Sequence, residues 1–127
     1  MRGSTASSVA DVSLSWYSSA PSDLQALDDD VQNAAIRGLV DLLGDPFIGE
    51  ELRYLRGLGD LSACRKLYID VPPDKRVPGP SRYRIVYRLL PNSDQPTTVQ
   101  IISLGPRADE IAYRRAVARL GRPPYRP

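Results

Sequence analysis

Two segments in the second half of the chain alternate apolar and polar side chains, and a third is apolar on both faces; this pattern constrains the fold more than any other feature. A period of two is typical of β-strands that bury one face. The alternation covers residues 66–71 and 83–90, and the segment apolar on both faces, 97–104, is expected inside a sheet. Consecutive strands with short links favour antiparallel pairing. The middle segment carries Tyr83, Ile85, Tyr87 and Leu89 on one face and Arg82, Arg84, Val86 and Arg88 on the other.

The first half has the pattern of one short strand followed by helices. Residues 12–17 alternate like a half-buried strand, and Ser22 with Gln25 matches a capping box at a helix start. The acidic run 28–30 predicts the start of a second helix. Gly44 and Pro46 predict its end. The apolar spacing predicts one buried face on this helix, formed by Ile36, Leu39, Val40 and Leu43.

A last helix is predicted after Gly105-Pro106, with Asp109 and Glu110 in its first turn. Its apolar stripe runs through Tyr113, Ala116, Val117 and Leu120. The order of elements predicts an α+β fold, a small antiparallel sheet of about four strands packed by an N-terminal helical hairpin and a C-terminal helix.

The chain of 127 residues is long enough for one modest core. We predict a flexible N-terminal arm over 1–11, a single domain over 12–122 and a Pro-rich tail over 123–127. Residues 72–80 contain four Pro and one Gly and predict a loop. No apolar run approaches the roughly 18 residues of a membrane helix, and the N-terminus lacks a signal-peptide core, so we expect a cytoplasmic protein without a membrane partner.

The formal net charge of +2 conceals two halves of opposite sign. Residues 1–61 carry 4 Arg against 10 Asp and Glu, a net −6, and residues 62–127 carry 13 Lys and Arg against 5 Asp and Glu, a net +8. All but Lys66 and Lys75 of the 17 basic residues are Arg, whose planar fork suits bidentate contact with phosphate. The basic half predicts a nucleic acid, an anionic surface or an acidic protein as partner.

The absence of His excludes Ser-His-Asp and Cys-His catalysis and every His-ligated metal site. The single cysteine, Cys64, excludes an intrachain disulfide and a CxxC metal site, and we expect it to be a small buried residue. We therefore predict no metal and no cofactor.

The stretch "RYRIVYRLL … VQIISLGPRADEIAYRRAVARL" resembles the RelE/ParE toxin superfamily of bacterial toxin–antitoxin systems. Its members show a "YR-x-x-Y" strand, a strand that ends in "G-x-R" and a downstream Tyr before a basic helix. The upstream "DLQAL", "DPFIGEELRYLRGL" and "CRKLYIDV" are similar to the family's helical hairpin and second strand. The resemblance spans about residues 12–122 and implies a RelE-like fold.

The resemblance also implies an activity and the residues that perform it. RelE-type toxins cleave messenger RNA in the ribosomal A site with basic residues instead of a His pair. By position, the catalytic residues implied are Lys66, Arg84, Arg107 and Tyr113. Some members have a second Lys two residues after the first, where this chain has Tyr68, and Lys75 or Arg76 of the Pro-rich loop could substitute. Residues expected to hold RNA are Tyr68, Arg82, Arg88, Arg114, Arg115 and Arg119.

Each role has a structural alternative. Arg84 and Arg107 could form salt bridges or cap a helix, and Tyr113 fits the apolar stripe of the last helix. Lys66 could act as general base only with a pKa far below the usual value near 10.4, as neighbouring Arg side chains would favour.

The expected function is a toxin of a type II toxin–antitoxin system, a ribosome-dependent endoribonuclease that cleaves mRNA and inhibits translation. Its expected partners are mRNA on the ribosome and a cognate antitoxin, in a toxin–antitoxin hetero-oligomer. Two alternatives stay open: a ParE-like inhibitor of DNA gyrase, and an inactive RNA- or protein-binding module of the same fold.

Overall fold

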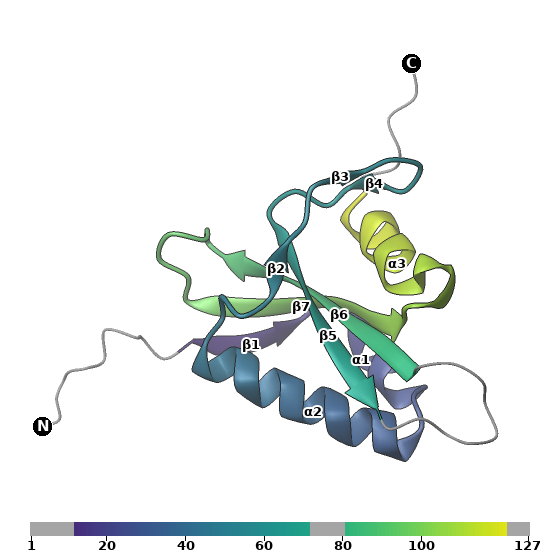
Figure 1. Cartoon of the computed structure of the whole chain (residues 1–127). Coiled ribbons are helices and arrows are strands. Elements are labelled where there is room, and N and C mark those ends of the chain that lie inside the picture. Colours follow the sequence, from purple (N-terminus) through teal and green to yellow (C-terminus); the bar gives the residue numbers. More distant parts are fainter. Residues whose placement is uncertain (1–11, 72–80, 122–127) are drawn as a thin grey trace, which may run out of the picture.

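The computed structural model describes residues 12–71 and 81–121. The arm 1–11, the loop 72–80 with Lys75 and Arg76, and the tail 123–127 were all named from the sequence and lie outside the described residues. Figure 1 shows the helices on both sides of a twisted sheet.

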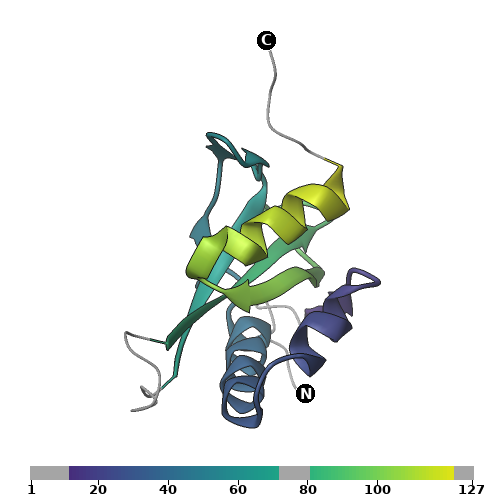
Figure 2. The ribbon, with the colours of Figure 1, turned by 90° about the vertical axis from the view of Figure 1, so that its right-hand side faces the viewer.

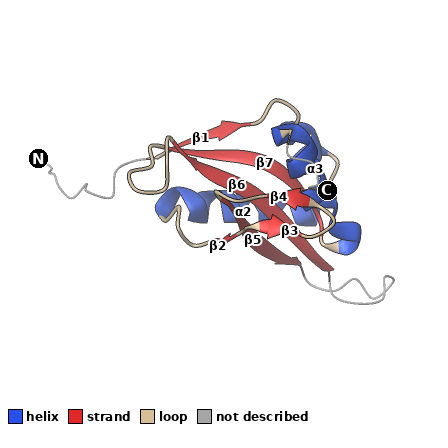
Figure 3. Cartoon of the chain, turned by 90° about the horizontal axis from the view of Figure 1, so that it is seen from above, coloured by secondary structure: helices blue, strands red, loops and turns tan. Residues whose placement is uncertain are grey.

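The described residues form a sheet of five strands in the order β1-β7-β6-β5-β2. The strands are β1 (Ser13–Trp16), β2 (Glu50–Glu51), β5 (Cys64–Val71), β6 (Ser81–Leu90) and β7 (Thr98–Pro106). Seen from above, β1, β7, β6 and β5 lie side by side (Figure 3). The three long strands pair antiparallel as predicted, whereas β1 runs parallel to β7, so the sheet is mixed. A small two-stranded sheet, β3 (Tyr54–Leu55) with β4 (Gly59–Asp60), precedes β5.

Two helices cover one face of the sheet and one covers the other (Figure 2). Helix α1 (Ala20–Gln25) packs on β7, and α2 (Asp29–Gly44) packs on β5. Helix α3 (Ile111–Leu120) packs on β7 and β6 from the opposite side, after the short 3-10 turn η2 (Ala108–Glu110). The predicted α+β class and RelE-like arrangement of elements are therefore confirmed.

Alternation along the strands divides the core into two layers. Ile85, Tyr87 and Leu89 of β6 pack with the α1–α2 side, whereas Val86 packs with the α3 side. A bulge in the β6–β7 pairing at Val86/Tyr87 lets Ile102 and Ser103 both belong to the α3 side, since Ser103 bonds Ala112 there. Every one of these side chains is at most 5% exposed, which confirms the predicted faces of this strand.

The predicted buried face of α2 is wrong. Of its four residues only Leu39 is buried, and Ile36, Val40 and Leu43 are 46%, 61% and 38% exposed. The face that packs on the sheet combines three small residues with three larger ones: Ala34, Ala35 and Gly38 with Val31, Leu39 and Leu42. A Cβ on Gly38 would stand 3.4 Å from Leu67, so α2 lies close to the sheet at this position.

Two helix starts also differ from the sequence prediction. Helix α1 begins at Ala20, so Ser22 lies inside it and is not the N-cap residue. Asp109 and Glu110 precede α3 and adopt positive φ angles of 58° and 54°, instead of forming its first turn. Two consecutive non-glycine residues in this left-handed region are costly and need support from their surroundings.

Candidate active site

The pairing of β5 with β6 brings the predicted residues of two strands together. Tyr68 lies directly opposite Arg84, and Lys66 lies opposite Val86. Because side chains alternate, Lys66, Tyr68 and Arg84 all project to the face that α3 covers in part. Helix α3 adds Tyr113 at its first turn, and η2 adds Glu110. We call the group formed by Lys66, Tyr68, Arg82, Arg84, Glu110 and Tyr113 the arginine–tyrosine cluster.

Arg84 lies at the centre of this cluster. Its guanidinium carbon is 4.1 Å from the centre of the Tyr113 ring and 5.5 Å from that of Tyr68. Its Nη1 donates a 2.5 Å hydrogen bond to a carboxylate oxygen of Glu110. The Arg84 side chain is only 5% exposed, and among the described residues its Nε is the one buried side-chain nitrogen or oxygen without a hydrogen-bond partner. Arg84 is therefore a fixed cation that keeps one unused donor.

Lys66 is bound to tyrosine oxygen and stays an ammonium group. Its Nζ donates a 3.0 Å hydrogen bond to Tyr68 Oη, and lies 3.8 Å from a carboxylate oxygen of Glu50 on β2. Burial lowers the pKa of Lys66, but the interactions with Tyr68 and Tyr113 outweigh this and leave that pKa above its ordinary value. This direction is opposite to the one that a general base requires, since Lys66 holds its proton more firmly than a free lysine.

The pKa values of the two tyrosines in the cluster shift in opposite directions. The hydrogen bond from Lys66 lowers the pKa of Tyr68 despite burial, and Arg84 adds to this effect. Burial raises the pKa of Tyr113, although Arg84 and Lys66 oppose it. Tyr113 of α3 is buried in the core on its side of the sheet, and its ring also faces Arg84.

Arg82 joins the cluster at its exposed edge. It forms a bidentate pair with Asp70, with nitrogen–oxygen distances of 2.7 and 3.1 Å. Its guanidinium lies 4.4 Å from the centre of the Tyr68 ring. Arg82 lowers the pKa of the Asp70 carboxyl, and both side chains are largely in solvent.

Three further predicted residues lie outside the cluster. Arg107 is exposed at the start of η2, and its backbone N–H donates to the Arg82 carbonyl at 2.9 Å. Arg114 is exposed on α3 and donates to the Asp109 carbonyl at 2.9 Å. Arg88 lies at the other end of β6, where it donates to Gln100 at 2.6 Å.

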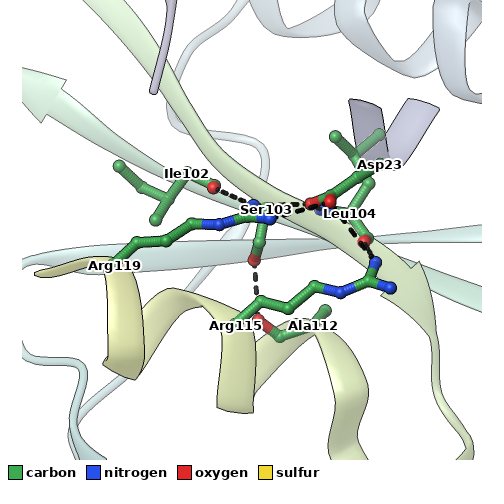
Figure 4. A network of polar contacts seen from close by, with 7 residues as sticks. All are labelled: Asp23, Ile102, Ser103, Leu104, Ala112, Arg115 and Arg119. Carbon is green, nitrogen blue, oxygen red and sulfur yellow. Dashed lines mark hydrogen bonds and ion pairs between the residues drawn. The ribbon is translucent and has the colours of Figure 1, made fainter. Parts of the chain in front are cut away.

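Arg115 and Arg119 have structural roles. Figure 4 shows both reaching from α3 toward Asp23 of α1. Arg119 forms a bidentate pair with Asp23 at 2.6 and 2.8 Å and also donates to the Ile102 carbonyl. Arg115 donates to the Leu104 carbonyl at 2.6 Å and lies 3.5 Å from Asp23. The expectation that they hold RNA is therefore not supported, since their guanidinium groups already bind the protein.

Sequence reasoning missed Glu110, which binds Arg84, and Asp23, which binds Arg119. Glu110 was interpreted as a first-turn helix residue, and the adjacent Asp109 gave the same signal. Asp23 stood within a predicted capping segment, and nothing in its spacing indicated burial. The usable signal was the density of Arg in the second half, because buried arginines need carboxylate partners.

The described residues contain no group of three or more Asp, Glu or Cys side chains placed to hold a metal ion. Over the same residues, the helices are too short or too polar to cross a membrane.

Comparison with solved structures gives several matches over most of the chain. A variant of the E. coli toxin RelE in the free state is 26% identical, covers 87% of this chain and 98% of its own, and superposes with a TM-score of 0.56. The isolated E. coli RelE toxin is 25% identical, with coverage of 86% and 98% and a TM-score of 0.52. The chain has a RelE-type toxin fold. The resemblance noted in the sequence is thus confirmed for the fold.

The RelE-type fold also matches the toxin–antitoxin complex RelBE2 from Mycobacterium tuberculosis, at 22% identity, 76% and 99% coverage and a TM-score of 0.50. No family model matches the sequence, and comparison with curated proteins finds no match. The similarity to RelE supports a toxin of a toxin–antitoxin system as the class of protein.

Proposed function

We propose that this protein is a toxin that cleaves messenger RNA on the ribosome and so inhibits translation. The observation that carries the proposal is the arginine–tyrosine cluster, in which a RelE-type fold brings Lys66, Arg84 and Tyr113 to one face of the sheet. Three cations and two aromatic rings within this small region are suited to a phosphate group and its neighbouring base.

Cleavage by transesterification makes specific demands on such a site. The 2′-hydroxyl loses a proton, attacks the phosphorus in line, and the 5′-oxygen leaves with a proton. The pentavalent intermediate carries extra negative charge, which Arg84 and Lys66 would stabilise as fixed cations. Tyr113 would hold the Arg84 guanidinium in position through its ring, and Arg107 would bind the phosphate near the leaving oxygen.

The preorganisation of Arg84 supports its role. Its guanidinium is held by Glu110 and by the Tyr113 ring, so it needs little reorganisation when charge develops beside it. A buried donor without a partner, such as Arg84 Nε, is rare in folded proteins, and a catalytic role is one of its explanations.

A cognate antitoxin is proposed as the protein partner, in a toxin–antitoxin hetero-oligomer. One of the matching solved structures is itself a toxin–antitoxin complex. An acidic segment of the antitoxin laid over the arginine–tyrosine cluster would neutralise the toxin by charge complementarity.

The proposal is tested by adding the purified protein to a translation mixture programmed with a defined mRNA and mapping the new 5′ ends. We expect cleavage within codons in the A site. Arg84→Ala or Arg107→Ala should reduce the rate of cleavage by about 10²- to 10³-fold. Arg37→Ala is the matched control, because Arg37 is an exposed arginine on α2, across the sheet from the cluster.

Two results would overturn the proposal. Intact mRNA together with accumulated cleaved DNA–gyrase complexes would identify a gyrase inhibitor. Salt-sensitive RNA binding without cleavage, even on programmed ribosomes, would identify an inactive binding module.

A further inference from the structure

The proposed cleavage needs a group that accepts the proton of the 2′-hydroxyl. With no His in the chain, the cluster offers the amine of Lys66, the phenols of Tyr68 and Tyr113, and the carboxylate of Glu110. Lys66 is held in its protonated form by the tyrosines around it. Tyr113 is 5% exposed, and burial raises the pKa of its phenol, so it holds its proton more firmly than a free tyrosine.

We propose that the phenol oxygen of Tyr68 is the general base of this site, and that Lys66 and Arg84 favour its ionised form. The inference rests on the proposed RNA cleavage. It assigns to Tyr68 a reacting atom, beyond the RNA contact that the sequence predicted.

The geometry around Tyr68 favours a negative charge on its oxygen. Lys66 Nζ donates a 3.0 Å hydrogen bond directly to Oη. Three cations surround the ring, at 4.4 Å for Arg82, 4.7 Å for Lys66 and 5.5 Å for Arg84, measured to the ring centre. Ionisation of a phenol next to several fixed cations is favoured by Coulomb attraction.

Three acidic groups lie near the cations around Tyr68, and each is paired. Asp70 on β5 is bound by Arg82, Glu110 of η2 is bound by Arg84, and Glu50 of β2 lies 3.8 Å from Lys66 Nζ. Tyr113 of α3 faces Arg84 from the other side and is neutral. The hydrogen bond from Lys66 is the largest cause of the lowered pKa of Tyr68, and burial opposes it only in part.

Tyr68 also lies where the reaction is proposed to occur. It is paired across the sheet with Arg84, the central cation, and the residue is only partly buried. Glu110 is the competing base, but its carboxylate is bound to Arg84 through a short hydrogen bond.

The step balances with no added reactant. The phenolate takes the proton of the 2′-hydroxyl, the 2′-oxygen forms a bond to phosphorus, and the bond from phosphorus to the 5′-oxygen breaks. The products are a 2′,3′-cyclic phosphate and a 5′-hydroxyl, whose proton comes from solvent. Tyr68 returns to the phenolate by releasing its proton to water.

The test compares Tyr68→Phe with the parent in single-turnover cleavage on programmed ribosomes. Phe keeps the ring that stacks and faces the cations, and removes only the oxygen. We expect the rate to fall by about 10²- to 10⁴-fold, the usual contribution of a general base. The parent rate should rise with pH until the phenol is ionised, and the residual rate of Tyr68→Phe should lack this rise. Tyr83→Phe is the control, because Tyr83 neighbours Arg84 in β6 but packs with the α1–α2 side.

A second measurement does not depend on RNA cleavage. The chain has seven tyrosines, so the phenolate absorbance of the parent minus that of Tyr68→Phe isolates Tyr68. We expect this difference to titrate below the ordinary value near 10, and Lys66→Met to move it upward.

The outcomes separate the inference from the function on which it rests. A parent protein that leaves mRNA intact overturns the proposed function. Cleavage by Tyr68→Phe within about threefold of the parent rate overturns only the assignment of Tyr68. The same holds if Tyr68 titrates at or above the value of a free tyrosine, or if Lys66→Met leaves its titration unchanged.

Discussion

Asp23 is a buried carboxylate whose partners explain why it is tolerated in the core. Strand β1 ends at Trp16, which pairs with Ile101, and within residues 12–71 and 81–121 no strand pairs with that edge of β7 beyond this point. Asp23 accepts the Leu104 N–H at 3.0 Å, and Arg119 and Arg115 donate to the Ile102 and Leu104 carbonyls. The network therefore satisfies backbone groups at an open sheet edge and ties α1 to α3 around it.

We expect Asp23→Ala to lower the free energy of unfolding by about 3–5 kcal/mol, because it leaves Arg119 buried without its partner. Asp23→Asn should cost less, since its amide oxygen can still accept the Leu104 N–H. Urea unfolding measures both. Asp41→Ala on the exposed face of α2 is the control and should stay within about 0.5 kcal/mol of the parent. Equal effects at Asp23 and Asp41 would contradict this account of the network.

Tyr87 gives a prediction about alkaline pH. Its hydroxyl is fully buried, donates to the Pro46 carbonyl and accepts the Gly49 N–H, both at 2.9 Å, and burial raises the pKa of the phenol. A raised folded-state pKa gives stability that is complete below the unfolded value near 10 and is lost as pH rises through the folded value.

Tyr87→Phe should therefore cost about 1–3 kcal/mol at pH 8, since two backbone groups lose their partner. Its unfolding free energy should then fall less steeply than that of the parent as pH rises above 10. Part of the loss of unfolding free energy above pH 10 should remain in this variant. The pKa values of Tyr113 and Lys66 are also raised in the folded state, so both groups lose stability in the same direction as pH rises. Urea unfolding at pH 8 and pH 10.5 checks this, and parallel losses in the two proteins would refute it.

Residue by residue, the sequence predicted the cations of the site better than their partners. Alternation along β5 and β6 was enough to place Lys66, Tyr68 and Arg84 on one face. Glu110 was missed because a left-handed backbone, and not a helical turn, aims it at Arg84. The contacts of Arg115 and Arg119 were missed because the residue that binds them lies more than 90 positions earlier, and no local sequence pattern indicates such a contact.

At the scale of elements, helix α2 shows how packing distance selects the buried face. The helix has two apolar stripes, and the one with larger side chains faces solvent. Ala34, Ala35 and Gly38 let the helix backbone approach the sheet, where Gly38 is within van der Waals reach of Leu67 and Ile85. Hydrophobic spacing gives equal weight to both stripes, so it could not identify the closer fit.

This account predicts a sharp contrast within α2. Leu42→Ala removes a fully buried side chain and should lower the free energy of unfolding by about 2–5 kcal/mol. Val40→Ala removes a side chain that is 61% exposed and should stay within about 0.5 kcal/mol of the parent. Urea unfolding of the two variants measures this difference. A larger loss of stability at Val40 than at Leu42 would favour the buried face that the sequence predicted.

The strands were predictable because alternation and sheet burial depend on the same period of two. Strands β5, β6 and β7 fall within a few residues of the predicted segments. The two-residue strands β2, β3 and β4 are too short to carry a period, and their pairing depends on contacts with the rest of the fold. The parallel pairing of β1 follows from helices α1 and α2 and the strands between it and β7, which local spacing does not encode.

For the molecule as a whole, the sheet separates charge of opposite sign. Helix α2 carries three Asp and one Arg, whereas α3 carries three Arg and no acidic residue. Because α2 and α3 pack on opposite faces, the net acidic helix and the net basic helix lie on two sides of the sheet (Figure 2). An anionic ligand is then drawn to the side that carries the arginine–tyrosine cluster.

Salt dependence of RNA binding measures this separation. Each phosphate neutralised by a cation adds about 0.7 to the slope of log K against log salt for a single strand. Arg107→Gln should therefore weaken binding of a short single-stranded RNA and reduce the slope by about 0.7, because Arg107 is exposed beside the Arg82 end of the cluster. Arg37→Gln removes the same charge from α2 and should leave the slope unchanged, since its face of the sheet points away from the ligand.

Fluorescence anisotropy between about 50 and 200 mM salt distinguishes the slopes of the two variants, over the range where phosphate contacts dominate affinity. Equal losses of slope in Arg107→Gln and Arg37→Gln would mean that RNA binding depends on the net charge of the chain and not on which side of the sheet the charge lies.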